Sequence, residues 1–159
     1  REGEYQAISA ALEGLKAANA QLQERFSPEL NRWAADYLSR LTGGRYRELS
    51  LDRELDASAM EGSGVLPRRA LFLSKGTVDQ IYLAVRLAVY DLCLKERRAP
   101  LVLDDALAAF DDGRMALALD LLAQLAEDRQ ILLFTCQSRE AACLSGRPEV
   151  TIQSLPARA

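Results

Sequence analysis

Two short apolar runs, each preceded by a helical pattern, constrain the fold of this chain most. Residues 101–103 and 131–134 contain only hydrophobic side chains, and we predict strands over 101–103 and 130–135, each buried on both faces of a parallel sheet. A helix and an edge strand over 149–155 are expected to follow. Right-handed crossovers join such elements into an α/β domain, whose ligands bind beyond the carboxyl ends of the strands.

Composition excludes several classes of function. The 159 residues, 49% of them hydrophobic, suffice for one compact domain, and the net charge of −3 creates no basic field for nucleic acid. The absence of histidine excludes Ser-His-Asp and Cys-His catalysis and any His-ligated metal. Cys93, Cys136 and Cys143 lack CxxC spacing, which favours reduced thiols over disulfides or a metal site. Without a long apolar run or a signal peptide, we expect a cytoplasmic protein with no membrane contact.

The first 26 residues carry a heptad pattern. Apolar side chains recur in steps of three and four at Tyr5, Ile8, Leu12, Leu15, Leu22 and Phe26, and the polar Asn19 falls in the same seam. This pattern predicts that residues 1–26 are the end of a coiled coil that enters a globular region, 27–159. The alternative is an amphipathic helix lying on its own domain. Because the pattern is under way at Arg1, we expect a piece of a longer protein.

Helix and strand signals follow in the next fifty residues. Ser27-Pro28 predicts a break and a new helix over 28–41, which Gly43-Gly44 ends. Strands are expected at 45–52 and 54–60, with an extended edge segment over 65–73. Four arginines in this region, Arg45, Arg47, Arg68 and Arg69, form either a basic surface or, as we favour, a solvated face.

The stretch Leu73–Gln80 opens the helix that precedes the first buried strand. The pattern predicts a capping box between Thr77 and Gln80. Ser74 and the Gly76 N–H, at the helix start, can hold an anion through unpaired amides and the helix dipole. An inward stripe is expected at Ile81, Ala84, Val85, Ala88, Val89 and Leu92. A Ser-x-Gly sequence alone is most often only a helix cap.

Carboxylates and amides follow the two buried strands. Asp104 and Asp105 come directly after the first strand, and Cys136 and Gln137 after the second, so we expect all four at one rim. Asp104 suits Mg²⁺ and Asp105 could orient a water molecule. Taken alone, such an Asp pair is usually surface acid. Helices are predicted over 114–127, with Leu117, Leu121, Leu122 and Leu125 inward, and over 138–144 with Ser138 as N-cap.

The joint order of these motifs resembles the ABC-type heads of SMC-like DNA-repair ATPases, above all the SbcC-like and RecN-like bacterial proteins. The matching segments are Leu73-Ser74-Lys75-Gly76-Thr77, residues 83–88, Leu101–Asp105, Phe110-Asp111, residues 132–135 and the earlier Leu41–Tyr46. The resemblance spans about residues 28–155. It implies the carboxyl-terminal lobe of a P-loop ATPase head, a mostly parallel sheet flanked by helices with a coiled-coil stub.

The resemblance also implies roles for individual residues. Ser74 and Gly76 stand at the signature motif, which binds ATP held by a second head, and Gln80 lies in the signature helix. Asp104 is the Walker B acid that serves Mg²⁺, and Asp105 stands at the catalytic carboxylate. Asp111 is the D-loop acid. Gln137 falls where the family usually has a switch histidine.

Three departures from the family pattern are visible. No G-x-x-x-x-G-K-[ST] sequence occurs, so the phosphate loop is expected on a separate amino-terminal lobe. Asp105 replaces the more frequent Glu, which shortens the carboxylate arm. Gln137 can hydrogen-bond a phosphate or water but cannot become cationic, which predicts slower hydrolysis.

Three interpretations of the sequence remain open. The leading one is half of an ATPase head in DNA repair or chromosome handling, inactive alone. Its implied partners are the amino-terminal lobe, a second head, DNA and a nuclease. The second is a non-catalytic dimerisation or scaffold module. The third is a transporter nucleotide domain, against which the heptad seam argues.

Overall fold

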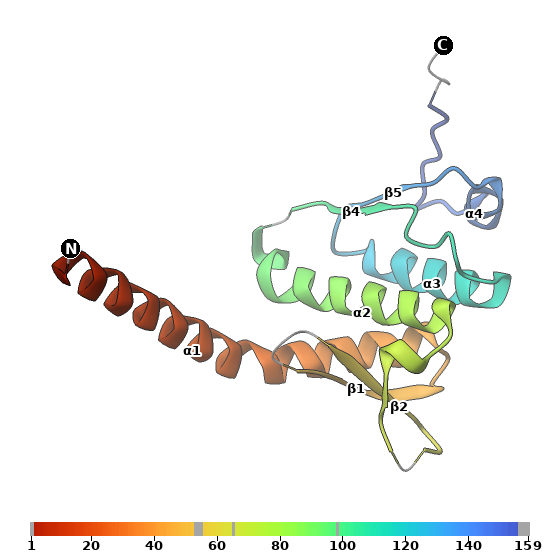
Figure 1. Ribbon diagram of the computed structural model, residues 1–159. Helices are drawn as coiled ribbons and strands as arrows, with labels where there is room; N and C mark the ends of the chain where they lie inside the picture. The colour runs from red at the N-terminus through yellow and green to blue at the C-terminus, as the bar shows by residue number, and fades with distance from the viewer. Residues whose placement is uncertain (1, 53–55, 65, 98, 156–159) are drawn as a thin grey trace.

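A computed structural model describes residues 2–52, 56–64, 66–97 and 99–155, arranged as a body with one long projecting helix (Figure 1). The helices are α1 (Glu2–Leu41), α2 (Lys75–Cys93), α3 (Asp112–Leu125) and α4 (Ser138–Leu144). The strands are β1 (Tyr46–Leu51), β2 (Ala57–Glu61), β3 (Arg68–Arg69), β4 (Leu101–Asp104) and β5 (Ile131–Phe134). Short 3₁₀ turns lie at Ala70–Phe72 and Lys95–Arg97.

The predicted break at Ser27-Pro28 is wrong, because α1 runs without interruption from Glu2 to Leu41 with Pro28 inside it. Proline removes one helical hydrogen bond and crowds the preceding turn. The helix nevertheless continues, since Ala, Leu, Glu and Gln, which are strong helix formers, dominate both sides of Pro28. A Ser-Pro pair marks a helix start only when the preceding residues are not already helical.

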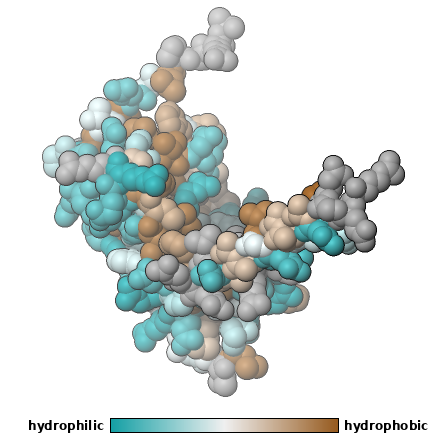
Figure 2. All heavy atoms as spheres, turned by 90° about the vertical axis from the view of Figure 1, so that its left-hand side faces the viewer, coloured by the Kyte–Doolittle hydropathy of each residue, from teal (hydrophilic) through white to brown (hydrophobic). Residues whose placement is uncertain are grey.

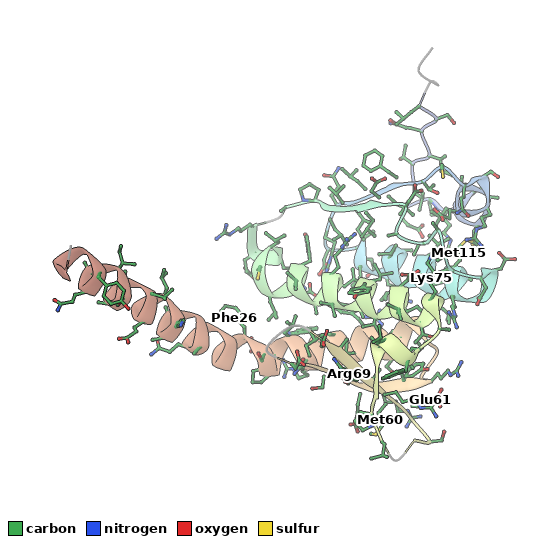
Figure 3. All side chains as sticks on the ribbon, in the orientation of Figure 1. Phe26, Met60, Glu61, Arg69, Lys75 and Met115 are labelled. Carbon is green, nitrogen blue, oxygen red and sulfur yellow. The ribbon has the colours of Figure 1, made fainter. Side chains whose placement is uncertain are left out.

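The amino-terminal half of α1 projects from the body without packing on it (Figure 3). Its apolar residues are exposed, from 51% for Leu12 to 73% for Tyr5. An amphipathic helix lying on its own domain is therefore excluded for the described residues. The side chains of Asn19 and Leu22 lie outside the described part. An exposed heptad seam is what a coiled-coil strand shows when its partner helix is not present.

The second half of α1 belongs to the core. Ala34, Tyr37, Leu38 and Leu41 are buried, as the pattern over 28–41 predicted. After the helix ends at Leu41, Gly43 has φ +59° and Gly44 has φ +83°, and the Gly44 amide donates to the Ser39 carbonyl. These left-handed conformations close a helix at little steric cost only when the residues are glycines.

The strands predicted around Asp52 form an antiparallel sheet in the order β1-β2-β3. Leu49 pairs with Ala59 and Leu51 with Ala57, and Ala59 pairs on its other side with Arg68. β3 is a two-residue edge strand that follows Pro67, as predicted, but the expected extended segment over 65–73 does not continue, because Ala70–Phe72 forms a 3₁₀ turn. The expected residue Glu54 and the start of the segment at Val65 lie outside the described residues.

The second sheet is the parallel pair β4-β5, with Leu103 opposite Leu133 and Asp104 opposite Phe134. The helices α2 and α3 lie on one side of this pair (Figure 1). Leu101 and Leu103 are buried, but Val102 is 50% and Phe134 45% exposed. The prediction of two strands buried on both faces is thus wrong for this chain, because the crossover helix α3 covers the same side as α2. None of the described residues covers the other face well enough to bury Val102, Leu132 or Phe134.

Apolar atoms form a strip that runs down the middle of the upper body in Figure 2 and includes the height where Figure 1 places β4 and β5. The exposed hydrophobic residues of this region are Val102, Leu132, Phe134, Ile152 and Leu155. The edge strand predicted over 149–155 does not form, since residues 151–155 have no regular structure.

The remaining predictions concern single positions in the helices. Within α2 the inward face includes Leu83, Leu87 and Tyr90, whereas Val89 is 41% exposed. Leu117 of α3 is 40% exposed, while Leu121, Leu122 and Leu125 are buried as predicted. Helix α4 forms, but its N-cap is Gln137 rather than Ser138. All three cysteines are free thiols, and no helix among the described residues is long and apolar enough to cross a membrane.

Candidate functional site

The carboxyl ends of β4 and β5 bring the predicted rim residues together. Asp105 adopts φ +44°, a left-handed conformation that is unfavourable for a residue with a Cβ. Its amide still donates to the Phe134 carbonyl at 2.9 Å. Its Oδ1 accepts the Cys136 N–H at 3.2 Å, and its Oδ2 lies 3.8 Å from Cys136 Sγ. The strained backbone therefore aims the carboxylate across to the end of β5.

Asp104 is the last residue of β4, and its side chain is exposed, like that of the neighbouring Asp105. Among the described residues no cluster of three or more acidic or cysteine side chains could hold a metal by itself. Mg²⁺ commonly keeps its waters and takes only one or two carboxylates plus substrate phosphates. Asp104 fits that limited demand, so the acid end of β4 suits an Mg²⁺-nucleotide whose phosphates are held elsewhere.

Gln137 lies beside this rim at the start of α4. Its Nε2 donates to the Ala108 carbonyl at 3.4 Å, and its Oε1 accepts from Arg139 Nε at 2.7 Å. The amide NH₂ group of Gln137 thus faces the loop that follows Asp105.

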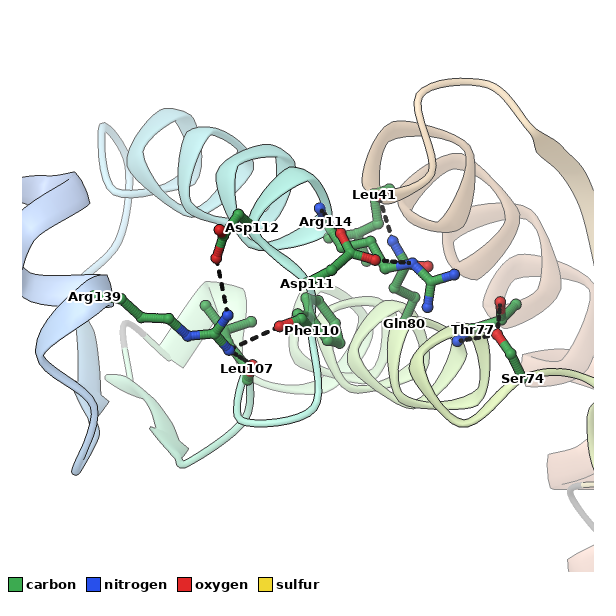
Figure 4. Close-up of polar contacts among 10 residues, drawn as sticks. All are labelled: Leu41, Ser74, Thr77, Gln80, Leu107, Phe110, Asp111, Asp112, Arg114 and Arg139. Atoms are coloured by element: carbon green, nitrogen blue, oxygen red, sulfur yellow. Dashed lines mark hydrogen bonds and ion pairs between the residues drawn. The ribbon is translucent and has the colours of Figure 1, made fainter.

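Arg139 uses its remaining nitrogens on the same loop (Figure 4). Nη2 donates to the carbonyls of Phe110 at 2.7 Å, Leu107 at 3.4 Å and Ala108 at 3.4 Å. Nη1 lies 3.2 Å from Asp112 Oδ1. Arg139 was not identified from the sequence, because no local sequence pattern predicts a contact between residue 139 and residues 105–112.

The start of α2 corrects the predicted capping box. Ser74, not Thr77, is the N-cap, and its Oγ accepts from the Thr77 N–H at 3.4 Å. Thr77 is buried in the first turn, with its hydroxyl 2.9 Å from Ser74 Oγ. The Ser74 side chain is therefore exposed at the helix start, where the first amides have no intrahelical partner.

Gln80 points into the core instead of back to the helix start. It is 2% exposed, and its Nε2 donates to the Leu41 carbonyl at 2.6 Å. That carbonyl belongs to the last turn of α1, where helical carbonyls lack partners. Gln80 thus ties α2 to the end of the projecting helix. Of the two residues predicted to hold an anion, Ser74 is exposed, whereas Gly76 is buried against the Arg114 side chain.

The first turns of α2 and α3 lie side by side (Figure 4). Asp111 is the N-cap of α3: its Oδ1 accepts the Arg114 N–H at 2.9 Å, and its Oδ2 lies 3.3 Å from Arg114 Nε. The Arg114 guanidinium covers the Cα of Gly76. A cavity of about 380 Å³ adjoins this contact, with Thr42 and Arg45 also in its wall. Arg114, too, escaped sequence reasoning.

A buried polar cluster fixes α1 against α2. Tyr37 of α1 donates to Asp91 of α2, and Arg129 Nη1 lies 2.8 Å from Asp91 Oδ1. The side chains of Arg129 and Asp91 are only 3% and 5% exposed. Burial, with the hydrogen bond to Asp91, raises the pKa of the Tyr37 phenol well above its usual value. The phenol therefore stays protonated as the donor.

The four arginines considered as a basic surface lie on or beside the antiparallel sheet. Arg45 Nη2 lies 2.8 Å from Glu61, and this hydrogen-bonded partner lowers the pKa of the carboxyl. Arg69 pairs with Asp56. Arg47 and Arg68 are exposed. A face whose cations are partly neutralised matches the solvated face favoured from the sequence.

Comparisons with the sequences of known proteins give a match over part of the chain. No family model matches the chain. A stretch of 110 residues, 69% of the chain, is 34% identical to the uncharacterized Bacillus subtilis (strain 168) protein YhaN. The chain spans only 11% of the length of that protein.

Solved structures show which fold this is. An SMC ATPase studied for ATP-driven dimerization and DNA-stimulated activation superposes with a TM-score of 0.65 at 17% identity, covering 80% of this chain and 78% of that one. The Smc head of Pyrococcus furiosus, with an extended coiled coil and bound to the C-terminal domain of ScpA, gives 0.61 at 17% identity over 89% of this chain and 36% of that one. The SMC head domain of Thermotoga maritima gives 0.59 at 18% identity, with 79% and 44% covered.

The chain therefore has the α/β fold of an SMC ATPase head, in its carboxyl-terminal part. The predicted α/β fold class is confirmed. The expectation of a mostly parallel sheet is wrong for the described residues, in which β1, β2 and β3 pair antiparallel and only β4 and β5 pair in parallel.

Proposed function

We propose that this chain is the carboxyl-terminal half of an ATP-binding and hydrolysing head of an SMC-like protein. Residues 1–26 are the end of its coiled coil, and residues 27–159 are the lobe. The observation that carries the proposal is the open apolar face of β4 and β5 beside Asp104 and Asp105. An uninterrupted apolar parallel strand is normally covered on both sides. The covering layer that fits is the lobe carrying the phosphate loop, a motif this sequence lacks.

Two groups of residues divide the work in this proposal. Asp104 would hold Mg²⁺ on the nucleotide of its own head, and Asp105 with Gln137 would orient the attacking water. When bound, Mg²⁺ neutralises the phosphate charge that develops during transfer. Ser74 and the Gly76 amide bind the terminal phosphate of ATP on the second head, with Gln80 in the helix behind them. Asp111 lies at the contact between the two heads.

The finer assignment follows the SbcC-like and RecN-like resemblance. The full protein would act on DNA in double-strand-break repair or chromosome maintenance, with a second copy as partner. A nuclease subunit is a further expected partner. The exposed seam of α1 supports a coiled-coil partner helix, which in this proposal comes from the same protein.

The test is an ATPase assay of the lobe with and without its amino-terminal counterpart. We call this lobe combined with its amino-terminal counterpart the joined head. We expect ATP turnover only from the joined head, because this lobe lacks the phosphate loop that binds the phosphates. Full turnover by the lobe alone would contradict the half-site assignment. Asp105→Asn in the joined head should lower hydrolysis while leaving ATP-dependent dimerisation intact, since the carboxylate acts on water and not on the head contact.

A second candidate is a non-catalytic dimerisation module. The observation in its favour is that both Asp105 oxygens face Cys136, and that Gln137 supplies no cation. In this case the joined head dimerises but its slow hydrolysis is insensitive to Asp105→Asn. The same pair of measurements therefore separates the two candidates.

A further inference from the structure

Gln137 is an uncharged amide at the position where the proposed function needs an oriented donor. An amide can present either its oxygen or its nitrogen to a ligand, so the side chain must be held in one orientation to act as a donor. Arg139 Nε donates to Gln137 Oε1 at 2.7 Å, which leaves Nε2 directed to the Ala108 carbonyl. The arginine can satisfy only the oxygen end, because a guanidinium has no acceptor.

The same guanidinium also holds the loop between the acids and α3. Its Nη2 reaches three carbonyls, those of Leu107, Ala108 and Phe110, and its Nη1 reaches Asp112. This loop connects Asp105, on the proposed nucleotide side, with Asp111, at the proposed head contact. Backbone hydrogen bonds from Ala108 to Asp105 and from Phe110 to Leu107 complete a compact turn.

We propose that Arg139 is a positioning residue for the ATPase reaction: it locks the Gln137 amide as a donor and fixes the Leu107–Phe110 loop in one conformation. The proposal rests on the proposed function. The hydrogen bonds and ion pairs of Arg139 within the described residues go to Gln137, the loop and Asp112. It therefore acts through the amide and the loop, and not by touching the acids of the rim.

The chain offers a matched control in Arg147. This arginine lies just after α4 and, like Arg139, bridges to α3, in its case through Asp120. Its side chain is 30% exposed against 31% for Arg139. Its bridge lies away from the loop and from Gln137. Replacing either arginine removes an ion pair to α3, so a loss of stability that both variants show can be told apart from an effect on the loop that only the Arg139 variant shows.

The experiment uses the joined head with the variants Arg139→Met, Arg139→Lys, Arg147→Met, Gln137→Ala and the double Arg139→Met/Gln137→Ala. Hydrogen exchange of the amides over 107–110 is followed without nucleotide, and kcat and KM for ATP are measured in parallel. We expect Arg139→Met to speed exchange in this segment and to lower kcat about 10- to 100-fold with little change in KM. Arg139→Lys keeps the positive charge but not the planar set of guanidinium donors, so its exchange rate and kcat should lie between those of wild type and Arg139→Met.

The double variant separates positioning from general support. If Arg139 acts through Gln137, its replacement lowers kcat little once Gln137 is already alanine. Unchanged exchange over 107–110, full additivity with Gln137→Ala, or an equal effect of Arg147→Met would overturn the proposal. If the wild-type joined head does not hydrolyse ATP, the proposed function fails, and the exchange data still decide whether Arg139 holds the loop.

Discussion

The guanidinium of Arg114 occupies the space where a side chain on Gly76 would begin. A Cβ at position 76 would collide with Arg114 Nη1 and stand 3.1 Å from its Cζ. The same arginine forms an ion pair with Asp111. The turn that opens α2 and the loop that opens α3 are thereby held against each other, and a glycine at position 76 is what permits the contact.

Gly76→Ala should therefore destabilise the fold by about 1 kcal/mol, because the methyl group displaces Arg114 from Asp111. In an Arg114→Ala background the same change should be neutral or stabilising, since alanine is the better helix former and the obstacle is gone. Chemical denaturation of the four proteins measures this change of sign. An equal cost of Gly76→Ala in both backgrounds would show that Arg114 is not the neighbour that matters.

The buried Asp91–Arg129 pair gives a second prediction. Asp91→Asn should lower the free energy of unfolding by about 3 kcal/mol, because it leaves the buried guanidinium with only the half-exposed Asp128 as a counter-charge. Tyr37→Phe should cost only about 1 kcal/mol, the value of one hydrogen bond. The apolar double variant Asp91→Leu/Arg129→Met should be milder than Asp91→Asn. A double variant that is worse than either single change would argue that the ion pair itself stabilises the fold.

Glu140 of α4 is 1% exposed, and neither carboxylate oxygen has a hydrogen-bond partner among the described residues. Burying an unpaired charge is costly. We expect Glu140→Gln to raise the free energy of unfolding by about 1 kcal/mol, because it removes the charge and keeps the shape. Glu29→Gln, at an exposed position of α1, serves as the control and should change nothing. If Glu140→Gln instead destabilises the protein, the carboxylate has a partner in solution.

Asp128 supplies a pH dependence. Hydrogen bonds from Arg129 and then Lys95 lower its pKa to about 2, below the value of about 3.9 for an unfolded chain. A depressed carboxyl pKa adds stability that is complete above about pH 4 and disappears as the pH falls through about 2. The gain should be below about 1 kcal/mol, since the side chain is 48% exposed.

Urea titrations of wild type and Asp128→Asn at pH 5 and pH 2 test this assignment. The two proteins should differ at pH 5 and converge at pH 2, because protonation then removes the same charge in the wild type. A difference that persists at pH 2 would assign the loss to packing instead.

Local signals in the sequence predicted much of the secondary structure. The heptad steps before Phe26 lie in a helix, the paired glycines follow the end of that helix, and the two apolar runs form the strands β4 and β5. Such signals act over a few residues, so they can be read without knowing the fold. Asp105 and Cys136 meet because parallel strands end at one edge, which the strand order alone predicts.

What remained hidden depended on neighbours distant in the chain. Ser74 and Thr77 are both plausible caps, and only the burial of Thr77 decides between them. Gln80 takes a core position because the Leu41 carbonyl, 39 residues away, needs a donor. Arg114 and Arg139 find their partners through the packing of helices, which no local pattern encodes. Val102 was predicted to be buried, since its sequence suits a covered strand, and nothing among the described residues provides the second cover.

The central claim is that the Ser74–Gly76 turn and the Asp104–Asp105 pair serve different nucleotides, one on each head. Mixing joined heads that carry Ser74→Arg with joined heads that carry Asp105→Asn tests it most directly. Each variant alone should be inactive. The mixture should recover about a quarter of the wild-type ATPase rate. Random pairing makes about half of the dimers mixed, and each mixed dimer contains one intact site instead of two. A mixture no more active than its components, beside an active wild type, would contradict the claim.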